Sequence, residues 1–338
     1  MGVFVLYLLR LQNKDCFEER TMQDLNNKKS SIFQNPIILT LIALLCCALW
    51  GSATPAIKIG YRLLSVEGVQ SIMLFAGIRF FLAGIFTVII FSIARQKFLF
   101  PKKENWGRVL TVGAVQTVIQ YIFFYLGLAY TSGVKGTIAS GTGAFFSVLI
   151  ASLIFRQEKL TVKKIIACVV GFLGIVVINL DGLTFTSDPL DLLGVGFVLL
   201  SAIAVSFSSV LIKKYSAHED PVTISGYQFI VGGFFMIIIG LLAGGEISLS
   251  SPVGIADLIY LSLLSAIAYS LWGILLKYNP VSKVTVFNFT TPVFGVLLTM
   301  LFLSGESSRI NIVNLIITLI LISTGILLLN YKKKDKRS

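Results

Sequence analysis

Residues 121–158 read YIFFYLGLAYTSGVKGTIASGTGAFFSVLIASLIFRQE, and residues 269–306 read YSLWGILLKYNPVSKVTVFNFTTPVFGVLLTMLFLSGE. Shifted by 148 residues without a gap, the two stretches are identical at 11 of 38 positions. Such self-similarity predicts a fold built from two copies of one structural unit. The identical pairs are Tyr121/Tyr269, Leu128/Leu276, Tyr130/Tyr278, Lys135/Lys283, Thr137/Thr285, Thr142/Thr290, Phe146/Phe294, Val148/Val296, Leu149/Leu297, Leu153/Leu301 and Glu158/Glu306.

The composition is that of an integral membrane protein. Of the 338 residues, 56% are apolar and 13% are charged, and the mean hydropathy is +0.88. In water such a chain would expose large apolar patches, whereas lipid matches an apolar surface. The net charge of +12 lies in short connections and tails between apolar runs. We therefore expect these charges to orient helices in a bilayer, and we expect no nucleic-acid partner.

Metal and cofactor motifs are missing from the sequence. Cys16, Cys46, Cys47 and Cys168 lack the spacing of a metal site or a disulfide, and His218 is the single histidine. The connections are also too short for an ATP-binding domain. We expect neither a metal nor a cofactor.

Ten apolar segments follow a mostly polar start, and each is long enough to cross a bilayer, which takes about 20 residues. They lie at 36–58, 69–93, 106–129, 133–155, 162–180, 190–212, 222–244, 254–277, 281–303 and 310–330. The alternating pattern of barrel strands is absent, so the segments are predicted to be helices. The prediction is an all-α integral membrane protein with five-helix repeats at 36–181 and 190–331. A polar, disordered tail is predicted at 1–35, and a basic cytoplasmic tail at 332–338. Met1 and Met22 are both candidate starts.

Lys and Arg residues are distributed unevenly between the two sides of the predicted membrane. If the N-terminus is cytoplasmic, the inside holds 23 of them and the outside four, and Arg79 lies within a helix. The positive-inside rule therefore predicts that both termini are cytoplasmic. Because five helices is an odd number, the second repeat is inverted relative to the first. Inverted repeats in many transporters surround a substrate site at the membrane midplane and rock about it.

Several motifs resemble the drug/metabolite transporter superfamily, specifically its ten-helix EamA-type members. They are LWGSATPAIK at 49–58, GIRFFLAG at 77–84 and YLGLAYTSGVKGTIAS at 125–140, together with Glu158 and Glu306 at the ends of the fourth and ninth helices. The resemblance implies that helices one to four and six to nine surround a central cavity, with helices five and ten outside it. It also implies transport out of the cell.

Arg79 is the only charged residue well inside a predicted span. A charge at membrane depth costs about 2.5 to 3.5 kcal/mol even on insertion scales, which makes Arg79 a functional candidate. It either faces the cavity and attracts a carboxylate or phosphate, or it braces the helix by donating to backbone carbonyls. The second interpretation is favoured, because AGIRFFLAG at 76–84 aligns with SGYQFIVGG at 225–233 and places Gln228 opposite Arg79.

Aromatic and polar side chains in the spans are further candidates to line the cavity. The aromatic ones suit a partly apolar metabolite, but they could equally be interface anchors or packing residues. The polar ones either donate hydrogen bonds into the cavity or tie helices together. The complete set of cavity candidates is Trp50, Arg79, Gln120, Tyr121, Ser140, Ser206, Gln228, Tyr269, Trp272 and Asn288.

Prolines predict where helices bend. Pro55 lies within the first helix, where it is expected to produce a kink suited to a moving gate. The second copy has Pro292 where the first has Ala144. Gly141 and Gly143 are expected to supply close packing or local bending in the first copy instead.

Glu158 and Glu306 end their helices near opposite membrane surfaces in the predicted topology. We expect each carboxylate to pair with Lys or Arg across a gate. For Glu158 the candidate partners are Lys159, Lys163 or a cation near 102–108.

The predicted function is secondary transport of a small polar or amphipathic, amino-acid-like solute across the plasma membrane by alternating access. The carboxylates, among them Asp191 and Asp257, are predicted to lie at helix ends or in loops, which favours facilitated diffusion or exchange over proton antiport. Outward direction rests on the family resemblance alone. An uncoupled channel or facilitator is the alternative, and an enzyme is disfavoured because no catalytic cluster is found. Expected partners are the substrate and the bilayer, and a homodimer is compatible with the sequence.

Overall fold

The computed structural model describes residues 32–180, 183, 188–302 and 311–330. In this part of the chain the secondary structure is helical and contains no β-strand, which confirms the predicted all-α membrane fold. The predicted tails, apart from residues 32–35, lie outside the described residues, as does Glu306.

The described helices follow the predicted segments closely. The first and second spans are α3 (Pro36–Leu63) and α4 (Gly68–Arg95). The third span consists of η1 (Lys103–Asn105), α5 (Trp106–Val112), η2 (Gly113–Ile119) and α6 (Gln120–Tyr130). The fourth consists of α7 (Gly133–Gly141), α8 (Gly143–Leu149) and η3 (Ile150–Ile154), and the fifth is α9 (Val162–Ile178). The sixth, seventh and eighth spans are α10 (Pro189–Tyr215), α11 (Pro221–Leu242) and α12 (Pro252–Tyr278). The ninth span consists of α13 (Val281–Thr285), η5 (Val286–Thr290) and α14 (Thr291–Phe302), and the tenth is α15 (Ile312–Asn330).

Nine of these spans, within the described residues, are long and apolar enough to cross a membrane. The other, α9, has 17 residues. At 1.5 Å per residue it measures about 26 Å, slightly less than the ~30 Å hydrocarbon core of a typical bilayer. The count of ten membrane crossings therefore stays a prediction.

Four of the long helices start with the same local device. A polar side chain accepts a hydrogen bond from a backbone N–H of the first turn, and a proline occupies the first helical position, where its missing N–H costs nothing. These capping residues are Asn35 for α3, Asp188 for α10, Asp220 for α11 and Ser251 for α12.

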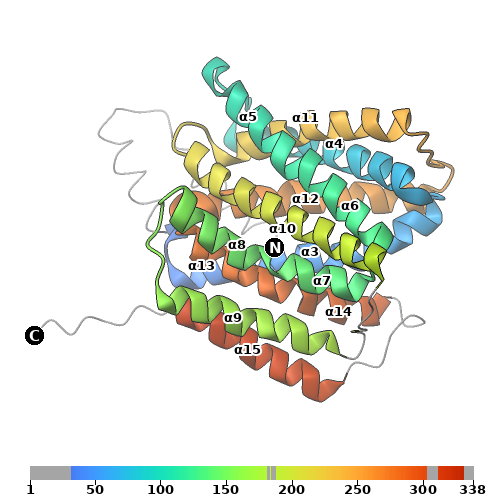
Figure 1. Cartoon of the computed structure of the whole chain (residues 1–338). Helices are drawn as coiled ribbons and strands as arrows, with labels where there is room; N and C mark the ends of the chain where they lie inside the picture. Colours follow the sequence, from blue (N-terminus) through green and yellow to red (C-terminus); the bar gives the residue numbers. More distant parts are fainter. Residues whose placement is uncertain (1–31, 181–182, 184–187, 303–310, 331–338) are drawn as a thin grey trace, which may run out of the picture.

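The two repeats exchange their first helices. α3 of the first repeat packs against α12 and α14 of the second, and α10 of the second repeat packs against α6, α7 and α8 of the first. We call α3, α12, α13, η5 and α14 bundle A, and α6, α7, α8, η3 and α10 bundle B. The remaining long helices pair with their counterparts, α4 with α11 and α9 with α15 (Figure 1).

Glycines let α4 and α11 approach until their backbones touch. Gly77 and Gly84 of α4 occupy the positions of Gly226 and Gly233 of α11 in the repeat. A Cβ on Gly84 would lie 2.5 Å from the Gly226 carbonyl oxygen, and one on Gly233 would lie 2.4 Å from the Phe81 backbone nitrogen. Small residues allow this packing between membrane helices, which gain no hydrophobic driving force from one another. The contact holds the two halves together at their centre.

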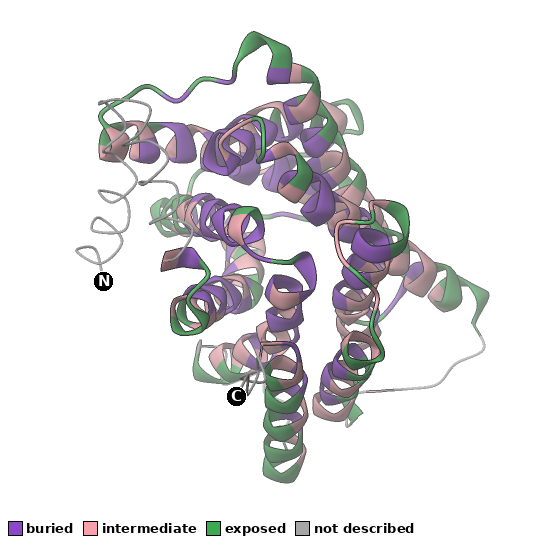
Figure 2. Ribbon diagram, turned by 90° about the vertical axis from the view of Figure 1, so that its left-hand side faces the viewer, coloured by how far each residue is buried: buried purple, intermediate pink, exposed green. Residues whose placement is uncertain are grey.

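Connections that the charge pattern assigns to one side of the membrane lie together at one end of the molecule. Hydrogen bonds join the segments there, including Lys102 N to Glu219 Oε2 at 2.9 Å and Asn279 Nδ2 to the Phe33 carbonyl at 3.0 Å. Buried residues gather where helices face one another, and exposed residues lie on the outer faces and at the ends (Figure 2). We refer to the end at which residues 102, 219, 279 and 33 are joined by hydrogen bonds as the predicted cytoplasmic end.

Candidate functional site

Four aromatic rings from equivalent positions of the two repeats meet at the centre of the molecule. The hydroxyls of Tyr121 and Tyr269 share a hydrogen bond of 3.0 Å. Phe80 and Phe229 stack with centroids 5.2 Å apart and planes 9° apart, and each ring also contacts its own repeat's tyrosine, at 4.5 and 4.9 Å. Equivalent residues can touch only near the axis that relates the repeats, so this aromatic quartet marks the approximate two-fold axis.

Tryptophans extend the quartet on one side only. Trp50 of α3 contacts Tyr269 and Trp272 of α12 edge to face, with ring centroids 5.1 and 5.0 Å apart. The Trp50 indole N–H is buried and lacks a hydrogen-bond partner in the described structure. In the first repeat the position of Trp272 is taken by Phe124, which contacts Tyr121 at 6.3 Å. The two sides of the axis therefore present different aromatic residues, and the tryptophan side includes an unpaired donor.

A pair of equivalent hydrogen bonds crosses between the repeats beside the quartet. Arg79 Nη2 of α4 donates to Ser265 Oγ of α12 at 3.0 Å. The counterpart of this bond joins Thr117 Oγ1 of η2 to Gln228 Oε1 of α11 at 2.6 Å. Thr117 and Ser265 are 148 residues apart, like the tyrosines. Arg79 thus braces two helices, as predicted for its second role, although its acceptor is a side-chain hydroxyl.

The charge of Arg79 is nevertheless unbalanced at short range. Arg79 is 4% exposed, lies over the Phe80 ring at 5.1 Å, and forms no ion pair with a carboxylate of the described residues. Its positive charge acts on the hydroxyls of Tyr121 and Tyr269 and on those of Tyr61 and Tyr125. A buried cation at membrane depth can hold the anionic group of a small solute.

The other cavity candidates divide by exposure and partners. Trp50, Gln120, Tyr121, Tyr269, Ser140 and Asn288 are partly accessible, whereas Arg79, Gln228, Trp272 and Ser206 are buried. Ser206 Oγ donates to the carbonyls of Gly143 and Ala202, so it ties α10 to α8. Ser140 and Asn288 have no hydrogen bond or ring contact with the quartet in the described part of the chain.

Two glutamines next to quartet residues in the chain, Gln120 and Gln228, have side-chain amide atoms without hydrogen-bond partners among the described residues. Gln120 Oε1 and Gln228 Nε2 are buried without hydrogen-bond partners among the described residues. Buried amide groups are normally satisfied, and exceptions in a native fold call for an explanation. Together with the Trp50 indole they offer one acceptor and two donors near the centre.

The fourth and ninth spans are interrupted at equivalent positions. Thr142 separates α7 from α8, and its hydroxyl donates to the Ala139 carbonyl at 2.6 Å. Thr290 ends the 3₁₀ segment η5, and its hydroxyl donates to the Phe287 carbonyl at 2.7 Å. The interruption occurs in both copies, next to Ala144 in one and to Pro292 in the other. Proline is therefore not its common cause, and what the two copies share is a threonine hydroxyl that donates to the carbonyl three residues earlier.

Pro55 leaves α3 continuous, because the helix runs from Pro36 to Leu63 through it. The proline lacks the N–H that would otherwise bond the Gly51 carbonyl. Gly51 lies against α14, where a Cβ on it would come within 2.5 Å of Phe294 Cβ. Whether α3 bends there during transport stays a prediction.

Two contacts close the predicted cytoplasmic end between the bundles. The Glu158 carboxylate of bundle B accepts from Ser282 Oγ of bundle A at 2.5 Å and from the Ser282 backbone N–H at 3.0 Å. Lys213 Nζ of bundle B donates to the Leu276 and Asn279 carbonyls of bundle A at 3.0 and 2.6 Å. We call these contacts the cytoplasmic latch. The equivalent of Glu158, Glu306, lies outside the described residues.

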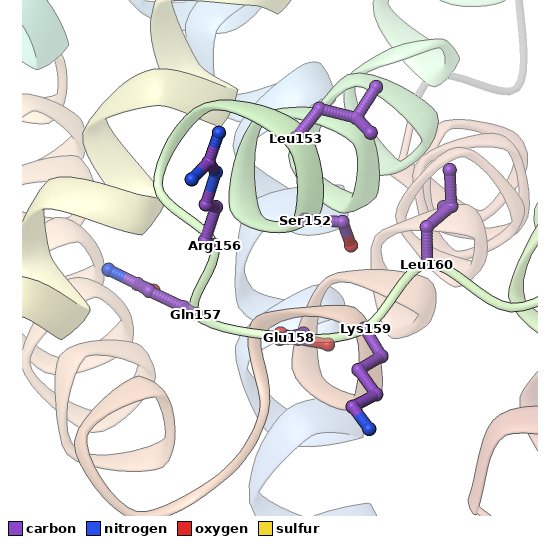
Figure 3. A pocket seen from close by; sticks show the side chains of 7 residues that line it. All are labelled: Ser152, Leu153, Arg156, Gln157, Glu158, Lys159 and Leu160. Carbon is purple, nitrogen blue, oxygen red and sulfur yellow. The ribbon is translucent and has the colours of Figure 1, made fainter.

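Glu158 is held in its charged form. Its cation partner is Lys164 at 2.6 Å, a residue that the sequence-based prediction did not single out. Burial tends to raise the pKa of Glu158, but hydrogen bonds from Lys164 and Ser282 outweigh burial and hold the pKa below its ordinary value. The connection that carries Glu158 lines a surface hollow of about 680 Å³ (Figure 3).

Sequence reasoning missed part of this site. Phe80, Phe229, Thr117 and Ser265 were not candidates, although the aligned motifs at 76–84 and 225–233 contain the two phenylalanines at matching positions. The signal was therefore present for the phenylalanines. Thr117 and Ser265 differ in type and lie before the opening repeat, so no identity marked them.

The chain is similar in sequence to a transporter family and to proteins named as transporters, and similar in fold to a solved structure. The EamA-like transporter family matches residues 37–180 and 192–331. A protein named an uncharacterized transporter from Archaeoglobus fulgidus is 27% identical over 76% of this chain and 87% of its own length. The uncharacterized transporter YvbV of Bacillus subtilis is 26% identical over 79% and 85%. A solved crystal structure matches with a TM-score of 0.70 at 18% identity, over 86% of this chain and 96% of that one.

Proposed function

Because the chain belongs to the EamA-like transporter family and is a multi-pass membrane transporter, we propose that it carries a small amphipathic, amino-acid-like metabolite by alternating access. The observation that carries this proposal is the aromatic quartet on the repeat axis. A site on that axis contacts both halves of the molecule, so rocking of the halves can expose it to either side in turn.

The surroundings of the quartet support the substrate class. Arg79 supplies a positive charge beside it, suited to a carboxylate. Trp50 and Trp272 supply an apolar wall, and the unpaired indole N–H and amide atoms supply hydrogen bonds. An amino-acid-like solute combines these features, with a carboxylate, polar hydrogen-bonding atoms and a carbon skeleton.

The latch supports a gated transporter over the alternative of an open channel. Glu158 and Lys213 join the bundles at one end, so passage there requires these hydrogen bonds to break. Contacts that join the bundles at one end, and that can break, are an arrangement that alternating access requires. We place the protein in the plasma membrane with both termini cytoplasmic, on the distribution of Lys and Arg.

Export is the proposed direction, and metabolite profiling tests it. Culture medium of cells that overproduce the protein is compared with medium of cells that carry the Tyr121→Ala, Tyr269→Ala double variant. We expect one or a few amino-acid-like solutes to accumulate outside only with the wild-type protein. Solutes identified in this way are then followed in proteoliposomes. Flux equal to that of empty liposomes, or unitary channel currents, would contradict the proposal.

A further inference from the structure

Asp257 lies near the start of α12, and its side chain is partly buried. It is the sixth residue of α12, in the second turn, on the face that also carries Leu261 and Ser265 one and two turns later. Leu261 and Ser265 are fully buried, so this face points into the protein. Ser265, about 12 Å further along α12 in helical rise than Asp257, is the residue that Arg79 of α4 contacts.

Gly60 of α3 forms a cradle for the Asp257 carboxyl group. A Cβ built on Gly60 would lie 2.6 Å from Asp257 Oδ2 and 3.1 Å from the Phe75 ring, so the carboxyl oxygen occupies the space that any larger residue would fill. Oδ2 is sealed from solvent and has no hydrogen-bond partner in the described structure. Asp257 as a whole is partly exposed, but an unpaired negative charge on the sealed oxygen is costly, whereas a neutral carboxylic acid is far less so.

The charged and titratable groups on the neighbouring helices are few. Arg79 of α4 lies one turn beyond Phe75, and its positive charge acts on the Asp257 carboxyl group. On α3 the titratable neighbour of Gly60 is Tyr61, on which Arg79 also acts. Lys58 and Arg62, further along α3, have interactions of their own. Arg79 is therefore a cation whose charge influences both Asp257 and the central tyrosines.

We propose that Asp257 is a proton-binding site that couples substrate movement to H⁺, with Gly60 as its cradle and Arg79 as the charge with which it communicates. The inference rests on the transport function proposed above. Protonation adds one H⁺ from water to the carboxylate and leaves a neutral acid in the cradle. Loss of the proton leaves a carboxylate whose negative charge partly offsets the positive charge of Arg79. The electrostatic field at the aromatic quartet then changes.

A proton suits this site better than a metal ion does. Hard metal ions take several oxygen ligands. In the described part of the chain no three His, Cys, Asp or Glu side chains gather to hold a metal. The neighbour of Asp257 Oδ2 on α3 is Gly60, which has no side-chain ligating atom. One sealed oxygen can bind a proton with no other ligand.

Proton binding is tested without a substrate, by infrared spectroscopy of the full-length protein in lipid over a pH series. Spectra of Asp257→Asn are compared with wild type, with Glu246→Gln as the matched variant, because Glu246 is an exposed carboxylate in the connection after α11. We expect Asp257→Asn alone to remove the band of a carboxylic acid in an apolar environment. Gly60→Ala should shift that band, because it displaces the carboxyl group while keeping it. An unchanged band in both variants would overturn the proposal.

Coupling is tested in proteoliposomes loaded with a pH-sensitive dye and supplied with a mixture of radiolabelled standard amino acids. We expect the wild type and Glu246→Gln to move protons when label moves, and Asp257→Asn to lose the proton movement while label still crosses. Equal proton movement in Asp257→Asn would refute coupling through this residue. Absence of label movement in the wild type counts against the proposed substrate class, and the infrared band then decides on Asp257 alone.

Discussion

At the scale of single residues, the two repeats differ in charge at one position of the site, which is Arg79 in the first repeat and Gln228 in the second. Arg79 and Gln228 occupy equivalent positions, and each bonds a hydroxyl of the other repeat: Arg79 donates to Ser265, and Gln228 accepts from Thr117. The hydrogen bond is thus the shared structural role, and the charge is what the first repeat adds. A feature present in one copy only is the better candidate for substrate binding.

Arg79→Gln should separate these roles. Gln preserves a hydrogen bond to Ser265, as Gln228 does to Thr117, so we expect the free energy of unfolding to change by no more than about 1 kcal/mol. Uptake of labelled acidic and zwitterionic amino acids into proteoliposomes should fall at least about tenfold, the effect of losing ~1.4 kcal/mol of binding. Arg79→Lys keeps the charge and should retain part of the uptake. Undiminished uptake in Arg79→Gln would show that the charge is only structural.

Glu158→Gln should weaken the latch in a manner that depends on pH. Removing the carboxylate leaves Lys164 without its ion-pair partner and should lower the free energy of unfolding by about 2 kcal/mol at neutral pH. The pKa of Glu158 is held below its ordinary value, so its contribution is present above the unfolded value of about 4.3 and is lost as the pH falls through the folded value. Thermal unfolding of the two proteins at a series of pH values measures this difference. A gap that stays constant in acid would be inconsistent with this account.

At the scale of elements, close contact between α4 and α11 rests on glycines with backbone on the other side. Gly233 faces the Phe81 backbone nitrogen, which cannot move aside as a flexible side chain would. Gly196 in α10 faces open space, with no atom within 4 Å of a Cβ built on it. The two positions therefore form a matched pair.

Gly233→Ala should destabilise the protein by about 1–3 kcal/mol, because the added methyl group pushes two helices apart. Gly196→Ala should stabilise it slightly, since Ala is the better helix former by about 1 kcal/mol. Thermal unfolding in detergent, followed by circular dichroism, compares the two. Similar midpoints for both variants would mean that the α4–α11 contact is more pliable than the glycine geometry indicates.

Much of this element-level arrangement could be predicted from the sequence, and the exceptions have physical causes. Hydropathy located the spans because a bilayer selects length and apolarity directly, and the repeat located Tyr121 and Tyr269. The exchange of α3 and α10 was not predictable, because packing between apolar helices leaves no periodic signature. The contact of Asp257 with Gly60 was not predictable for a related reason, because Gly60 belongs to another helix and no local pattern records the pairing.

At the scale of the whole molecule, two bundles meet at a central site and are joined at one end. The latch connects bundle A to bundle B through Glu158 and Ser282. By contrast, the ion pair between Lys135 and Asp191, 2.7 Å apart, lies within bundle B. If the bundles move relative to each other, only the first contact must break.

Cross-linking tests that motion. A short thiol cross-linker applied to Glu158→Cys, Ser282→Cys should stop transport, because it holds the bundles together at the predicted cytoplasmic end. The same reagent on Lys135→Cys, Asp191→Cys should leave most transport intact, because both cysteines lie in one bundle. Reducing a cleavable linker should restore the first variant. Full activity of the linked first variant would argue against rocking of bundles A and B.

The exchange of α3 and α10 also bears on how the chain is assembled during synthesis. When the first repeat has left the ribosome, α6, α7 and α8 are present but their partner α10 is not yet made, and α3 lacks α12 and α14. Neither repeat expressed by itself can complete a bundle. A gene cut between the halves should therefore yield a working protein only when both fragments are synthesised in the same cell, where each supplies the helix that the other lacks.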